Sequence, residues 1–158
     1  MFDMKGTIDG SLLSQMIVHG AASINAQKQQ INELNVFPVP DGDTGTNMSM
    51  TISTASAELR KKPLTGVGAV AQVNANALLR GARGNSGVIL SLLFRGLSKA
   101  LKGMETADAA AFAAAGTTSA RLVVGTSYRP DHHQAHGESA QCLQCVFHHH
   151  FLWILSLY

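Results

Sequence analysis

Cysteine and charge are both scarce in this sequence. Only two cysteines occur among the 158 residues, too few for the disulfide framework of a small secreted domain. Charged residues make up 14% of the chain, and the net charge of +2 is too small to argue for nucleic acid as a partner. No basic stripe with interleaved aromatic residues occurs either. A nucleic-acid role therefore has no support in the composition.

Long apolar runs are also missing. No uninterrupted run approaches the ~20 residues that a membrane-spanning helix needs, so a membrane span is not expected. Residues 1–7 lack the charged start and apolar centre of a signal peptide, which makes a cytoplasmic location the default expectation. The hydrophobic content of 46% nevertheless predicts a large buried fraction, and the length suits one domain.

Helical spacing of apolar and small residues runs through most of the chain. Asp9 is predicted to cap a first helix, and a second helix follows the segment around residue 43. A third helix is expected over about 68–79 and a fourth over 86–101, with Thr106 capping an alanine-rich fifth. No segment alternates convincingly with a period of two, and the connections are short. This pattern predicts an all-α fold of antiparallel helices in a bundle or barrel.

Two aspartates flank a glycine in the connection before the second helix. A tight turn at Gly42 would direct the carboxylates of Asp41 and Asp43 toward one point, and oxygen ligands of this kind suit Mg²⁺. So sparse a pair fits a metal that arrives with a nucleotide, because Mg²⁺ keeps several waters and binds substrate phosphates as well. Pro38 and Pro40 stiffen the approach. An ordinary surface turn followed by a helix cap is the alternative interpretation.

The residues after the aspartates begin a predicted helix. They are Thr44, Gly45, Thr46 and Asn47. The first amides of a helix lack internal partners and its macrodipole is positive there, so this is a favourable position for phosphate oxygens. Met48 and Met50, which follow, are predicted to fill the core.

A second glycine-rich turn spans residues 81–87. Its candidate ligand-binding residues are Gly84, Asn85, Ser86 and Gly87. Arg80 and Arg83 would offer guanidinium donors to phosphate, and the two turns could face one ligand. A simple helix–loop–helix connection is the alternative. The Gly-x-x-x-x-Gly-Lys-Ser/Thr motif is absent, which argues against the usual phosphate-loop architecture.

Both turns carry a resemblance to a known family. Residues 35–48 read Asn-Val-Phe-Pro-Val-Pro-Asp-Gly-Asp-Thr-Gly-Thr-Asn-Met, and residues 81–96 begin Gly-Ala-Arg-Gly-Asn-Ser-Gly-Val-Ile-Leu-Ser. Together they resemble the DhaL-type kinase domain of bacterial fatty acid kinases. The resemblance covers about residues 5–115, somewhat more than the first half of such a domain.

The resemblance implies a fold, a cofactor and roles for individual residues. Such domains are antiparallel barrels of about eight helices that bind ATP at one end, with two Mg²⁺ ions held by loop aspartates. By position, Asp41 and Asp43 match the metal ligands, and Asn35 is a weaker ligand candidate. Residues 44–47 and 84–87 match the segments that contact the nucleotide and its phosphates. No catalytic base is implied, because positioning and charge neutralisation supply most of the catalysis in phosphoryl transfer.

The implied acceptor is an acyl carboxylate presented by a separate DegV-type fatty-acid-binding protein. A dihydroxyacetone-kinase-type phosphotransfer subunit is a second possibility, which the start of the motif at Asn35 argues against. A third possibility is a truncated, catalytically inactive fragment. The sequence leaves open whether two copies of the chain associate as a homodimer to complete a core.

The composition changes abruptly at Gly116. Residues 117–158 hold both cysteines, the only tryptophan and six of the seven histidines, and no helical periodicity is evident there. A shifted reading frame after about residue 115 is the hypothesis that accounts for this tail. Cys142 and Cys145, with His148 to His150 close behind, offer zinc ligands at a poor spacing.

Overall fold

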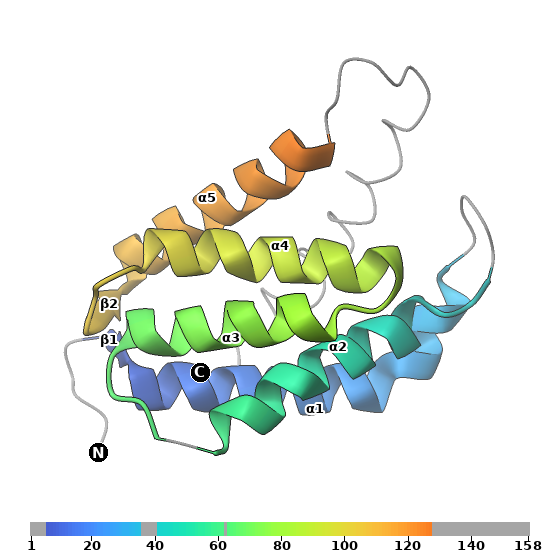
Figure 1. The fold of residues 1–158 in the computed structure, drawn as a ribbon, viewed down its shortest axis with the longest axis horizontal. Coiled ribbons are helices and arrows are strands. Elements are labelled where there is room, and N and C mark those ends of the chain that lie inside the picture. The colour runs from blue at the N-terminus through green and yellow to red at the C-terminus, as the bar shows by residue number, and fades with distance from the viewer. Residues whose placement is uncertain (1–5, 36–40, 62, 128–158) are drawn as a thin grey trace.

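Five helices and one small sheet form the part of the chain that the computed structural model describes, which is residues 6–35, 41–61 and 63–127 (Figure 1). The helices are α1 (Gly10–Glu33), α2 (Thr44–Leu59), α3 (Val67–Gly81), α4 (Gly84–Ala100) and α5 (Ala109–Ser127). The strands are β1 (Thr7–Asp9) and β2 (Thr106–Asp108). The predicted all-α class is confirmed.

Successive helices lie against each other along the chain. α1 packs on α2, α2 on α3, α3 on α4 and α4 on α5, and α2 also reaches α4 (Figure 1). The connections between α2 and α3 and between α3 and α4 are short, so these neighbours run antiparallel. No helix in the described part of the chain has the length and apolarity that a bilayer crossing requires.

The sheet was not predicted from the sequence. β1 pairs antiparallel with β2, with Thr7 opposite Asp108 and Asp9 opposite Thr106. Thr106 therefore belongs to a strand, and the prediction that it caps the fifth helix is wrong. Asp108 takes that role, because its Oδ1 accepts from the amide of Ala111 at 2.7 Å. The predicted cap at Asp9 is confirmed by the same arrangement with the amide of Leu12, also at 2.7 Å.

Two apolar clusters make up the core. The first lies toward the sheet and contains Leu13, Ile17, Leu59, Val67, Val70, Ala71, Leu97, Leu101, Ala107, Phe112 and Ala115. The second lies toward the opposite end and contains Ala21, Ile24, Met48, Ile52, Ala55, Ala77, Leu78 and Leu90. Asn74 of α3 lies between the two sets in sequence and is fully buried, and neither polar atom of its side chain has a hydrogen-bond partner among the described residues.

Some sequence predictions differ from the structure. Met48 is buried as predicted, but Met50 is 51% exposed on the outer face of α2. Helical structure does not end at Gly116, because α5 continues to Ser127 and buries Ser119 and Val123 beyond that glycine. Pro38, Pro40 and the cysteines and histidines of residues 132–150 lie outside the described residues. The domain boundary at residue 115 stays a prediction.

Candidate functional site

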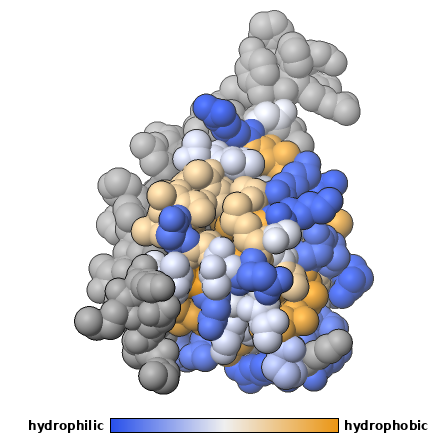
Figure 2. Space-filling model, turned by 90° about the vertical axis from the view of Figure 1, so that its left-hand side faces the viewer, coloured by the Kyte–Doolittle hydropathy of each residue, from blue (hydrophilic) through white to orange (hydrophobic). Residues whose placement is uncertain are grey.

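Both glycine-rich turns lie at the same end of the helix bundle. α1 ends and α2 begins there, and the turn between α3 and α4 lies beside them at the right of Figure 1. The sheet lies at the opposite end. Figure 2 views that opposite end, where pale orange, weakly hydrophobic surface lies among hydrophilic side chains. The first turns of α5, which directly follow β2, hold several exposed alanines, and alanine is a weakly hydrophobic residue of this kind.

Thr51 of α2 holds the second turn in place. Its side chain is fully buried, and Oγ1 accepts from the backbone amide of Arg83 at 3.0 Å. The same hydroxyl donates to the carbonyl oxygen of Asn47 at 2.7 Å. A Cβ added at Gly87 would collide with Thr51 Oγ1, so glycine permits the close approach of α4. Sequence reasoning missed Thr51, because a threonine within a helix carries no signal for a contact with a distant turn.

Gly84 brings the two turns into direct contact. Its φ is +57°, in the left-handed region that favours glycine, and a Cβ there would collide with Nδ2 of Asn47. Asn47 belongs to the first motif and Gly84 to the second. The structure therefore places the two sets of predicted ligand-binding residues, 44–47 and 84–87, side by side.

The aspartates lie on the exposed connection that precedes α2. Gly42 between them has φ +63°, which confirms that a glycine turn separates Asp41 from Asp43. Both aspartates are exposed. Nδ2 of Asn35 donates to Oδ1 of Asp41, so Asn35 supports one of the candidate metal ligands. A direct ligand role for Asn35 stays a prediction.

Asp43 differs from the other aspartates that precede helices. Asp9 and Asp108 each accept from the amide three residues later, as N-cap residues usually do. Asp43 is the N-cap residue of α2, but its side chain makes no capping hydrogen bond. Its carboxylate is exposed and accepts no hydrogen bond from α2, which leaves it free of the capping role that Asp9 and Asp108 perform.

Asn32 of α1 meets the start of α2 instead. Its Oδ1 accepts from the backbone amide of Thr46 at 3.1 Å, and its Nδ2 donates to Oγ1 of Thr46 at 3.0 Å. Gly45 makes this approach possible, since a Cβ there would collide with the carbonyl of Lys28. Asn32 was not among the predicted site residues, because it lies within a helical pattern and meets Thr46 only through folding.

Two helix N-termini converge where the turns meet. α2 and α4 both begin at this end, and neither is capped by a side chain of its own N-cap residue. Within the described residues, the backbone amides of Thr44, Gly45, Gly84, Asn85 and Ser86 meet no protein acceptor. Unpaired amides and two positive helix ends make this surface suitable for an anion such as phosphate.

The donor set fits a cation that is shared with a ligand. No group of three or more His, Cys, Asp or Glu side chains that could hold a metal is found in residues 6–35, 41–61 and 63–127. A closed structural metal site is thus not present there. Two carboxylates beside a surface that suits an anion are compatible with Mg²⁺, which takes one or two carboxylates together with waters and phosphate oxygens.

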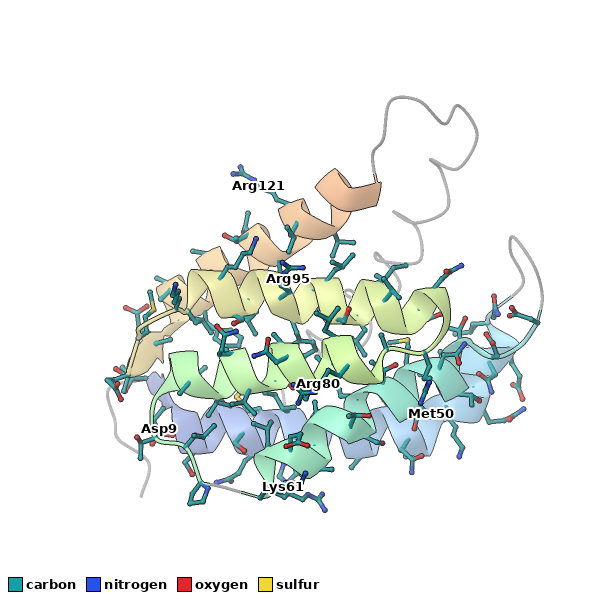
Figure 3. The ribbon with its side chains drawn as sticks, in the orientation of Figure 1. Asp9, Met50, Lys61, Arg80, Arg95 and Arg121 are labelled. Atoms are coloured by element: carbon teal, nitrogen blue, oxygen red, sulfur yellow. The ribbon has the colours of Figure 1, made fainter. Side chains whose placement is uncertain are left out.

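Arg80 belongs to the last turn of α3, and its side chain lies on the side of α3 that faces α2 (Figure 3). The pKa of the Glu58 carboxyl in α2 is lowered, chiefly by its hydrogen bond with Lys61 and by the charge of Lys61, and in part by the charge of Arg80. The Arg80 charge therefore acts on the flank formed by α2 and α3. Arg83 remains exposed at the start of α4.

Exposed apolar side chains surround the same end of the bundle. Met50 projects from α2 near that end (Figure 3). Leu34 directly follows α1, Leu79 belongs to the last turn of α3, and Val88 lies near the start of α4. Their exposed fractions range from 47% to 70%. Exposed apolar side chains near a surface that suits an anion are the composition expected where a ligand or a partner with both apolar and anionic parts binds.

Comparisons with known proteins cover this region. The model of the DAK2 domain family matches residues 38–127. An uncharacterized protein of Staphylococcus saprophyticus is 43% identical over 126 residues, which is 80% of this chain and 22% of that protein. Protein YloV of Bacillus subtilis is 45% identical over 109 residues, which is 69% of this chain and 20% of YloV.

A further relative comes from Staphylococcus aureus. This uncharacterized protein is 45% identical over 96 residues, covering 61% of this chain and 18% of its own length. The chain thus aligns with about a fifth of the length of these relatives. The segment that matches the DAK2 model includes both aspartates, the second turn and α5.

Proposed function

This chain belongs to the DAK2 domain family, as its resemblance to DhaL-type kinase domains predicted, and we propose that it binds ATP with Mg²⁺ for phosphoryl transfer to a fatty acid carboxylate. The observation that carries the proposal is that the first turns of α2 and α4 meet beside the exposed carboxylate of Asp43, and that neither helix is capped by the side chain of its own N-cap residue. Such a surface offers a cation site and an anion site in contact with each other, as a metal nucleotide requires.

Each part of the site has a role in the proposal. Asp41 and Asp43 would hold the metal, which would neutralise phosphate charge, and Asn35 would orient Asp41. The amides of residues 44–45 and 84–86 would bind phosphate oxygens. Thr46 and Asn47 would complete the contacts on the first turn, and Gly87 would let α4 approach Thr51.

The reaction would form an acyl phosphate. The bond between the γ-phosphorus and the β–γ bridging oxygen breaks, a new bond joins that phosphorus to a carboxylate oxygen, and ADP leaves. A fatty acid carboxylate is already ionised near neutral pH, so no side chain has to remove a proton. The acceptor would be presented by a DegV-type fatty-acid-binding protein, as the resemblance to fatty acid kinases implies.

Calorimetric titration of the purified chain with ATP, with and without Mg²⁺, tests the site. We expect binding that depends on Mg²⁺ and that is lost in Asp41→Asn and in Asp43→Asn, with helix content unchanged by circular dichroism. Asp108→Asn is the matched control, because it removes one carboxylate at the opposite end while asparagine remains a good cap. Wild-type affinity in both site variants would refute the metal site.

Product analysis tests the acceptor. The chain, MgATP and a fatty-acid-loaded DegV-type protein should yield an acyl phosphate that hydroxylamine traps. A chain that binds MgATP but forms no acyl phosphate would retain the nucleotide site without the proposed transfer. A chain that binds no nucleotide would match the third possibility raised by the sequence, a truncated and catalytically inactive fragment.

A further inference from the structure

We propose that Asn32 caps α2 in place of Asp43, and that this exchange keeps the Asp43 carboxylate available to a divalent cation. Asn32 would then be a positioning residue, because it acts on the cation only through Asp43. The consequence for the cation rests on the proposed function, whereas the capping assignment does not.

The backbone of Asp43 departs from that of an ordinary capping residue. Asp9 caps α1 from an extended conformation, with φ −97° and ψ 178°. Asp43 has φ −113° and ψ −2°, and its side chain accepts no hydrogen bond from α2. N-cap residues usually have extended dihedral angles and accept from the second or third amide of the helix. Asp43 therefore occupies the capping position in a conformation that does not cap.

The amide that Asp43 would normally cap has another acceptor. Thr46 is the third residue of α2, and its amide donates to Oδ1 of Asn32 at 3.1 Å. Nδ2 of Asn32 donates to Oγ1 of Thr46 at 3.0 Å. An asparagine side chain both accepts and donates, so it matches the amide and the hydroxyl of one residue together. Asn32 is also neutral, and it completes the cap without adding a negative charge.

The position of Asn32 depends on the packing of α1 against α2. A Cβ at Gly45 would collide with Lys28 and would lie 3.0 Å from Oδ1 of Asn32, so glycine lets the start of α2 reach this acceptor. A second side-chain hydrogen bond joins the same two helices farther from the start of α2: Oγ of Ser49 donates to Oδ1 of Asn25 at 3.1 Å. Asn25 thus links the same two helices without reaching the first turn of α2.

Without the Asn32 side chain, the carboxylate of Asp43 should cap α2 by accepting the hydrogen bond of the Thr46 amide. The amide of Thr46 would lose its acceptor, and the extended conformation of Asp43 would restore one. Mg²⁺ would then compete with a capping hydrogen bond for the same carboxylate. We expect the affinity for Mg²⁺ to fall by between about twofold and thirtyfold in Asn32→Ala, the range that measured N-cap contributions imply.

Nuclear magnetic resonance of the metal-free chain tests the capping assignment. Wild type should show a coupling across the hydrogen bond from the amide nitrogen of Thr46 to Cγ of Asn32. In Asn32→Ala the coupling should pass to Cγ of Asp43, and in Asn32→Asp it should remain with residue 32. The absence of a Thr46–Asn32 coupling in wild type overturns the proposal without requiring any variant to fold.

Titration with MgCl₂, followed by the amide shifts of residues 41–44, tests the consequence. Affinity should fall in Asn32→Ala, return in Asn32→Asp, and stay at the wild-type value in Asn25→Ala, the matched control. Equal affinities in wild type and Asn32→Ala would overturn the proposal. If MgCl₂ leaves the amide shifts of the wild-type chain unchanged, the proposed function is refuted. The couplings across the hydrogen bond of the Thr46 amide would still decide which residue caps α2.

Discussion

The backbone amide of Arg83 donates to Oγ1 of Thr51 at 3.0 Å, and this one hydrogen bond joins a turn between α3 and α4 to the middle of α2. Thr51 is fully buried and also donates to the carbonyl of Asn47. The two motifs of the candidate site therefore share a buried hydroxyl, whose removal should affect both.

Thr51→Val tests this connection. The substitution keeps the shape of the side chain but removes the acceptor of the part-buried hydrogen bond from the Arg83 amide, so the free energy of unfolding should fall by about 0.5–1.5 kcal/mol. Urea unfolding measures the change. Thr54→Val is the matched control, because Thr54 lies one turn along α2 and bonds only to the carbonyl of Met50. Equal stabilities of the two variants would contradict the role of Thr51.

Gly84→Ala should lower the free energy of unfolding by more than the cost of a positive φ alone. Alanine in a left-handed conformation costs about 1–2 kcal/mol, and here its Cβ would also displace the side chain of Asn47. Gly103→Ala isolates the conformational part, since Gly103 has φ +78° and nothing lies within 4 Å of its Cβ position. Denaturant unfolding of both variants, with the side-chain amide signals of Asn47, measures the difference. A shift of those signals is expected only in Gly84→Ala.

Gly45→Ala and Gly116→Ala should change stability in opposite directions. Gly116 lies within α5 with open space at its Cβ position, so alanine there should stabilise the protein by about 0.5–1 kcal/mol. A Cβ at Gly45 would meet the backbone of α1, and overpacking of this kind destabilises by about 1–3 kcal/mol. Thermal unfolding compares the two. A stabilising Gly45→Ala would show that α1 and α2 are less tightly packed than described.

Asn74→Leu should raise the free energy of unfolding. The amide of Asn74 is buried without a hydrogen-bond partner, which costs about 1–3 kcal/mol relative to a satisfied or apolar group. Asn76→Leu, on the exposed face of the same helix, reports the gain from helix propensity alone. Chemical denaturation should place Asn74→Leu above both wild type and this control. A lower stability in both Asn74→Leu and the smaller Asn74→Ala would mean that the Asn74 amide has a partner such as a bound water, whereas a loss confined to leucine would mean overpacking.

Helix positions followed from the sequence because apolar residues recur at helical spacing wherever one face is buried. The pattern of Met48 and Ile52 predicted α2, and both side chains are in the core. The strands were missed because three residues are too few to show alternation. α5 was cut short at Gly116 because Ser119, a small polar residue, occupies one of its buried positions.

The candidate site was predictable in its residue types but not in its connections. Asp41, Asp43 and the two glycine turns stand out because glycine, proline and aspartate rarely cluster without a reason in backbone geometry. Asn32 and Thr51 carry no such signal. Their roles come from contacts between helices, which only the packing of α1 and α3 on α2 creates.

The pairing of β1 with β2 has a consequence for the order in which this chain assembles during synthesis. It joins Thr7 to Asp108, about a hundred residues apart, and contacts between such distant positions form slowly. The hydrogen bonds of the candidate site span 14 residues between Asn32 and Thr46 and 32 between Thr51 and Arg83. A nascent chain that has emerged only as far as the middle of α4 already holds every residue of that site. The binding surface can therefore take shape on the ribosome before the strand that closes the other end of the bundle has emerged from the exit tunnel.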